Sequence, residues 1–107
     1  MTQTPPVPTF RVLAIGECMA ELAPAETAGD FHLGFAGDTY NTAWYLARVR
    51  PDASVGFFTG VGSDAISQQM RAAMRAGGID DRPIRTISDR TVGLYLITLD
   101  KGERSFS

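Results

Sequence analysis

Blocks of apolar and polar positions alternate along the chain and predict strands and helices in turn. Phe10–Gly16 is a short apolar run closed by glycine, which is typical of a strand buried on both faces of a sheet. Ser54–Thr59 is a second run of this kind, whereas Phe31–Phe35 alternates large side chains as a short exposed strand does. These segments are the expected strands of the N-terminal half.

Helical periodicity follows two of these strands. We expect Asp38 to cap the first helix, which Pro51 ends, and Asp64 to cap the second, which ends at Gly77. The apolar stripes are Tyr40, Ala43, Trp44 and Ala47 in the first helix, and Ile66, Met70, Ala73 and Met74 in the second. Strands and helices that alternate through short joints indicate an α/β fold with a parallel sheet.

The C-terminal part of the chain changes character. Ile84–Ile87, Val92–Leu99 and Glu103–Ser107 have strand patterns without helices between them, and residues 100–102 (Asp-Lys-Gly) have the composition of a hairpin turn. At the other end, we expect residues 1–9 to be a disordered Pro-rich tail and residues 10–107 to form the folded part.

Charge and composition narrow the range of partners. Ten Lys+Arg stand against twelve Asp+Glu in 107 residues, a net charge of -2, so we expect neither a nucleic-acid nor a membrane partner. Cys18 and His32 are single, which excludes an internal disulfide and a His/Cys zinc site. Glu17 and Glu21 interrupt the apolar stretch from Val12 to Ala23, so it is neither a signal peptide nor a membrane span. We expect a cytoplasmic protein.

Gly60–Ala65 matches the pattern G-x-G-x-x-A between an expected strand and an expected helix. The dinucleotide-binding fingerprint has this form, and Asp80 or Asp81 lies close to where its ribose-binding acid is sought. The alternative is a structural turn, because short glycine turns are common at α/β joints. The pattern alone favours the turn.

The segment Gly34–Ala43 is the stronger candidate for ligand binding. Its glycines allow a ligand to approach the backbone, and the helix that follows offers free N–H groups. Asn41 carries both a donor and an acceptor, which suits neighbouring hydroxyl groups. Asp38 is either a ligand-binding residue or only the helix cap.

Other polar residues leave two interpretations open. Glu17 and Glu21 follow the first strand at the end where α/β sheets bind ligands, so they are either a catalytic or metal-binding pair or solvated side chains. Tyr95 is a packing residue or part of a lid, and Arg104 either pairs with an acidic substrate or lies on the surface. We expect His32 to be structural or exposed.

Five segments in a fixed order give the chain a family resemblance. They are GECMAEL (16–22), AGDTYNTAWYLAR (36–48), FFTGVGSDAISQQM (57–70), VGLYLI (92–97) and GERSF (102–106). Together they resemble the N-terminal part of the PfkB, or ribokinase-like, carbohydrate kinases, most closely the 2-keto-3-deoxygluconate kinase branch. The resemblance covers nearly the whole chain from Val12 onward.

The resemblance implies a three-layer αβα core, which is Rossmann-like, and a small β-sheet lid with the sugar bound between them. Gly37 and Asn41 match the family's Gly-Gly-x-x-x-Asn sugar-binding stretch, and Tyr95 matches a lid tyrosine that faces the keto-sugar. Glu21 aligns with an acidic position that contacts sugar hydroxyls. The chain has Ala36 where the family usually has the first glycine.

The resemblance also implies what the remainder of such a kinase supplies. The catalytic aspartate of a Gly-x-Gly-Asp motif and the pocket for ATP and Mg²⁺ belong to the family's C-terminal half, and the sequence contains no such motif. We therefore expect an N-terminal fragment with part of the sugar-acid site, no catalytic residue and no tight cofactor binding. The alternative is a non-catalytic binding or dimerisation module or a truncated, inactive gene product, and the lid is the expected surface for a homo-oligomer.

Overall fold

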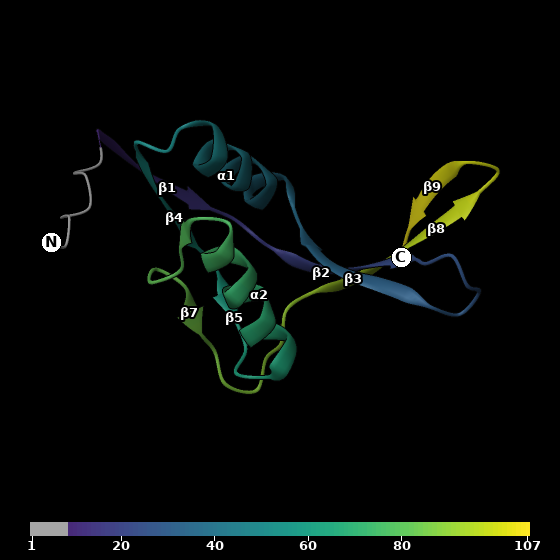
Figure 1. Cartoon of the computed structure of the whole chain (residues 1–107). Helices are drawn as coiled ribbons and strands as arrows, with labels where there is room; N and C mark the ends of the chain where they lie inside the picture. The colour runs from purple at the N-terminus through teal and green to yellow at the C-terminus, as the bar shows by residue number, and fades with distance from the viewer. Residues whose placement is uncertain (1–8) are drawn as a thin grey trace, which may run out of the picture.

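A computed structural model describes residues 9–107, which form a core and a projecting lid (Figure 1). In the core, β1 (Phe10–Ile15), β4 (Ala53–Phe58) and β6 (Ile79–Asp80) make a three-stranded parallel sheet in the order β1-β4-β6. The helices α1 (Asp38–Val49) and α2 (Ala65–Ala76) precede β4 and β6 along the chain. The predicted α/β class with a parallel sheet is confirmed.

Both helices pack on the same face of this sheet. Val55 and Phe57 of β4 point toward them, and the ring of Tyr40 from α1 meets Phe57 edge-on, with 6.0 Å between centroids. Met70 and Met74 from α2 are fully buried in the same cluster. The apolar stripes that the sequence predicts for the two helices therefore form one core.

The other face of the sheet is open within residues 9–107. Leu13 and Ile15 of β1 are 53% and 65% exposed, and Phe58 of β4 is 38% exposed. The prediction that β1 is buried on both faces is therefore wrong for the part of the chain that the structure describes. Exposed residues alternate with half-buried ones along β1, because the helices cover only one face of the sheet.

The lid is a four-stranded sheet in the order β3-β2-β8-β9. It contains β2 (Met19–Pro24), β3 (Phe31–Ala36), β8 (Leu94–Asp100) and β9 (Glu103–Phe106), and it extends away from the helices in Figure 1. β2 pairs antiparallel with β3 and parallel with β8. The hydrophobic pattern did not predict β2, because Glu21 interrupts its apolar positions on the face that carries the candidate site.

A two-stranded ladder connects the core to the lid. β5 (Gly60–Val61) pairs in parallel with β7 (Arg85–Thr86), and residues 87–93, which we call the strap, run from β7 to β8. In Figure 1 the strap curves round the N-terminal end of α2 before it rises toward the lid. The strap therefore passes the end of a core helix on its way to a lid strand.

The element ends test the local predictions. The hairpin turn is confirmed, since Lys101 and Gly102 have positive φ angles of 52° and 82°. Asp64 is the N-cap of α2, as predicted, but the N-cap of α1 is Gly37, so the assignment of this role to Asp38 is wrong. Asp38 instead begins the helix, and no side chain caps it.

Two further predictions concern the N-terminal tail and membrane-spanning segments. The Pro-rich tail falls almost entirely on residues 1–8, which lie outside the described residues. Within residues 9–107, no helix is long and apolar enough to span a membrane.

Candidate functional site

A pocket of about 300 Å³ lies where α1 meets the lid. Its lining residues are Glu21, Phe35, Ala36, Tyr40, Asn41, Trp44 and Tyr45. Glu21 comes from the middle of β2, and Asn41 comes from the first turn of α1. The fold thus brings together two residues that the sequence singled out from separate segments.

Tyr95 joins this site through Glu21. The two residues face each other in the parallel register of β2 and β8, and the Tyr95 hydroxyl donates a hydrogen bond of 2.6 Å to Oε2 of Glu21. Partial burial and then the hydrogen bond and charge of Glu21 raise the pKa of Tyr95 to about 12. Tyr95 is therefore a protonated donor at neutral pH, and Glu21 lines this pocket without Glu17.

Arg104 lies on the same face of the lid as Tyr95. The ring of Phe106 contacts Tyr95 edge-on at 5.8 Å, and Arg104 alternates with Phe106 along β9 so that both side chains share this face. Arg104 is exposed, and its positive charge partly offsets the rise in the pKa of Tyr95. Arg104 therefore places a positive charge on the face of the lid that carries Tyr95.

Two aromatic side chains of α1 line the pocket: Trp44, which the sequence analysis assigned to the apolar stripe, and Tyr45, which it did not single out. Trp44 and Tyr45 follow Asn41 at helical spacing, so all three occupy one side of α1. Tyr45 is 63% exposed, and its ring meets that of Trp44 edge-on at 5.2 Å. The signal in the sequence was the spacing of these two rings relative to Asn41.

Gly37 adjoins the site for a reason that concerns the protein's own backbone. A Cβ at Gly37 would lie 2.6 Å from the carbonyl oxygen of Glu17. The backbone N–H of Asn41 donates a hydrogen bond of 2.7 Å to the backbone carbonyl of Gly37, and this bond holds the first turn of α1. The connection between β1 and β2 therefore requires glycine here, whether or not a ligand approaches.

The remaining candidates lie apart from this pocket. Asp38 borders a different hollow of about 270 Å³ between α1 and β1, and its carbonyl accepts a hydrogen bond of 2.9 Å from Thr42. Glu17 is exposed and is not part of the pocket lining, and His32 is exposed on β3 as expected. Cys18 is buried, which together with the charge of Glu17 raises its pKa to about 12.

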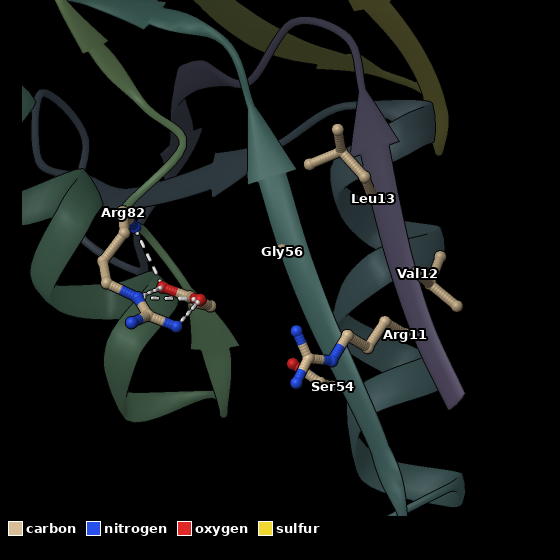
Figure 2. A pocket seen from close by; sticks show the side chains of 7 residues that line it. Arg11, Val12, Leu13, Ser54, Gly56 and Arg82 are labelled. Carbon is tan, nitrogen blue, oxygen red and sulfur yellow. Dashed lines mark hydrogen bonds and ion pairs between the residues drawn. The ribbon is translucent and has the colours of Figure 1, made fainter. Parts of the chain in front are cut away.

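The dinucleotide alternative loses its structural basis. Gly60 lies against Ile87, and Gly62 against the backbone of Arg90, so both glycines are explained by packing. Asp80 accepts a hydrogen bond from Arg82, and both residues line a second pocket of about 400 Å³ on the open face of the sheet, where Figure 2 shows Arg82. Asp81 is held by other arginines, so neither aspartate is free to bind a ribose.

Comparison with known protein families decides the identity of this fold. Residues 9–107 match the profile described as "pfkB family carbohydrate kinase". The chain belongs to the pfkB family.

Members of the pfkB family with named activities align with most of this chain. A 2-dehydro-3-deoxygluconokinase from Dickeya dadantii is 41% identical over 101 residues, which are 92% of this chain and 32% of that protein. The enzyme of the same name from Escherichia coli is 42% identical over 99 residues, which are 90% of this chain and 31% of the relative. The chain thus spans about a third of the length of these relatives.

Solved structures of pfkB-type kinases share the fold. A fructokinase from Xylella fastidiosa superposes with a TM-score of 0.79 at 27% identity, covering 91% of this chain and 31% of that one. A 2-dehydro-3-deoxygluconokinase from Thermotoga maritima gives a TM-score of 0.79 at 19% identity, covering 92% and 31%. The ribokinase-like fold class is therefore confirmed for the N-terminal part of such a kinase.

Proposed function

We propose that the protein phosphorylates a sugar acid resembling 2-keto-3-deoxygluconate with ATP, and that this chain carries part of the sugar site. The observation that supports the proposal most directly is the pocket between core and lid. Glu21 and Asn41 both line this pocket, and Glu21 accepts a hydrogen bond from Tyr95. Relatives that are 41% and 42% identical and bear the name 2-dehydro-3-deoxygluconokinase support the choice of substrate class.

Each residue of the proposed site has a distinct task. Asn41 donates to and accepts from neighbouring sugar hydroxyls, and Glu21 accepts a hydrogen bond from a third hydroxyl. Arg104 provides the positive charge that a sugar carboxylate requires. Gly37 holds the start of α1, and Asp38, which lies outside the pocket, adds negative charge near the free N–H groups of the first turn.

Phosphoryl transfer needs groups that the site does not provide. A base must take the proton of the attacking hydroxyl, and positive charge must surround the moving phosphoryl group. Within residues 9–107, no cluster of three His, Cys, Asp or Glu side chains forms a metal site. We assign the base, ATP and Mg²⁺ to the part of the relatives that this chain does not cover. A fructokinase of similar fold was solved with bound ATP.

The test is a substrate comparison with the complete gene product. With ATP and Mg²⁺, release of ADP is measured for 2-keto-3-deoxygluconate, fructose and ribose. We expect kcat/KM for the sugar acid to exceed that for fructose by at least about tenfold, which corresponds to about 1.4 kcal/mol. A preference for fructose would contradict the sugar-acid assignment, and binding of the acid without ADP release would favour a non-catalytic binding module.

An apolar face of the lid supports a second part of the proposal, which is a homo-oligomer formed through this sheet. Phe31, Leu33 and Leu94 are 47%, 42% and 51% exposed. Leu22 lies between Leu33 and Leu96 in the sheet register, so these side chains share the face opposite Glu21 and Tyr95. A large apolar patch of this kind is typical of an interface.

The proposed interface is tested by measuring molar mass with light scattering. Leu33→Lys is expected to convert a dimer to a monomer. His32→Lys is the control, because it places the same amine on the adjacent residue of β3, which faces the other side. A monomeric wild-type protein would contradict this assembly and leave the kinase assay unaffected.

A further inference from the structure

A chain of hydrogen bonds fastens the strap to the start of α2. The hydroxyl of Thr91 donates to Oδ2 of Asp64 at 2.7 Å, and the hydroxyl of Ser67 donates to Oδ1 at 2.6 Å. The amide of Gly62 in turn donates to the Ser67 oxygen at 2.9 Å. The two oxygens of the Asp64 carboxylate therefore bind one hydroxyl from α2 and one from the strap. Thr91 in the strap is 27 residues from Asp64 in the sequence.

Close backbone packing reinforces this connection. A Cβ on Gly62 would overlap the carbonyl oxygen of Arg90 and lie 2.5 Å from Oδ1 of Asp64. Ser67 is fully buried, so the helix side of the network is shielded from water. The strap backbone at Arg90 packs directly against the backbone of Gly62.

The strap leads from this point to the candidate sugar site by a short path. Val92 is buried in the core at 7% exposure, and the carbonyl of Gly93 accepts a hydrogen bond of 2.8 Å from the amide of Ala20 in β2. Tyr95 follows on β8, and its Cα is at most about 14 Å from that of Thr91 even in a fully extended chain. The strap is therefore held at three successive residues, Thr91, Val92 and Gly93, just before Tyr95.

A helix cap alone does not account for the arrangement. An N-cap carboxylate stabilises a helix by accepting hydrogen bonds from its free backbone N–H groups, and this function needs no partner in the strap. The side chain of Asp64 accepts no capping hydrogen bond from the backbone of α2. One of its oxygens accepts a hydrogen bond from the Thr91 hydroxyl instead. The contact to Thr91 links two parts of the fold.

We propose that Asp64 is a positioning residue for the sugar site, which acts through Thr91 to hold the strap so that Tyr95 reaches Glu21. The effect on substrate rests on the function proposed above. The effect on the strap and lid does not, because it concerns only the contacts of this chain.

The experiment compares three substitutions in the complete gene product. Thr91→Val removes the hydroxyl but keeps the shape of an exposed side chain, and Thr91→Ser restores a hydroxyl at the same position. Ser63→Ala is the control, because Ser63 is an exposed residue of the same turn outside the Asp64 network. Hydrogen exchange of the amides in residues 91–97 and in α1 is measured for each protein, together with the KM values for sugar acid and ATP.

In Thr91→Val, we expect exchange in residues 91–97 to become about two- to tenfold faster, the range that one lost hydrogen bond produces, with α1 unchanged. The sugar KM should rise by a similar factor while the ATP KM stays constant. Thr91→Ser and Ser63→Ala should match the wild type in both measurements.

Two results would overturn the proposal. One is unchanged exchange at residues 91–97 in Thr91→Val, and the other is a sugar KM equal to that of the wild type despite faster exchange. If the wild type phosphorylates no sugar acid, the proposed function fails, and the exchange measurement by itself still decides whether the Asp64–Thr91 contact holds the lid strand.

Discussion

The hydroxyl of Tyr95 donates a hydrogen bond of 2.6 Å to Oε2 of Glu21, although the two residues are 74 positions apart in the sequence. The bond joins neighbouring strands of the lid on the face that borders the pocket with Asn41. A carboxylate fixed by a phenol is oriented before a ligand arrives, which lowers the entropy lost on binding. The pair is therefore the centre of the proposed sugar site.

Tyr95→Phe tests whether this orientation matters for binding. The substituted ring still packs against Phe106, so we expect the free energy of unfolding to fall by about 1 kcal/mol or less. The sugar KM should rise, because Glu21 loses the donor that orients it. Thermal melts without ligand measure the change in stability, and melts with the sugar acid measure the change in binding. Equal stabilisation by the sugar acid in wild type and variant would contradict the role of Tyr95.

Tyr95→Ala separates binding from packing at the same position. If Tyr95 serves mainly the ligand, truncation should affect substrate binding more than stability. A loss of about 3–5 kcal/mol in unfolding free energy, which is typical of a buried aromatic residue, would instead identify Tyr95 as a packing residue. Denaturant unfolding of the unliganded protein provides the measurement.

Asn41→Ala is expected to weaken sugar binding by about 1–3 kcal/mol, because it leaves a bound hydroxyl without its partner. The sugar KM should rise and the ATP KM should stay nearly constant, as measured by steady-state kinetics. Gln69→Ala is a matched control, since Gln69 is an exposed amide on α2 outside the pocket lining. A raised ATP KM with an unchanged sugar KM would assign this stretch to the nucleotide.

Gly37→Ala should destabilise the fold by about 1–3 kcal/mol, because the new methyl group must displace the backbone of Glu17. Gly34→Ala is the control, since a Cβ at Gly34 has no neighbour within 4 Å. Thermal melts of the two variants give the comparison. Equal melting temperatures would show that the chain around Glu17 moves aside without cost.

Asp81 gives a prediction that depends on pH. Burial acts to raise its pKa, but the hydrogen bonds and charges of Arg71 and Arg75 outweigh burial, so its pKa is lowered. A lowered folded-state pKa stabilises the protein above the unfolded value of about 4, and this contribution is lost as the pH falls below it. Asp81→Asn should therefore cost about 1–3 kcal/mol at pH 7 and progressively less below about pH 4.

Asp80→Asn is the control for this pH dependence. Its partner Arg82 has a side chain that is 87% exposed, so loss of the ion pair should cost less than about 1 kcal/mol. Denaturant unfolding between pH 7 and pH 3 measures both variants. A penalty for Asp81→Asn that stays constant over this range would contradict the assigned cause.

Periodicity and turn composition were sufficient to predict most of the elements. The stripes from Tyr40 and from Met70 give helices, the run before Gly16 gives a strand, and residues 100–102 give a hairpin turn, since each pattern depends only on neighbours in the sequence. The family resemblance depended on such local segments too, and the comparisons bear it out.

The tertiary structure alone decided which of these residues meet. No local pattern predicts that Glu21 pairs with Tyr95, that Asp64 binds Thr91, or that Gly37 lies against the carbonyl of Glu17. These contacts depend on the register of strands distant in sequence and on how the strap crosses a helix end. The sequence by itself determined the parts of the fold and the chemical groups available, whereas long-range packing determined the site that they form, because only packing brings groups from separate segments within hydrogen-bonding distance.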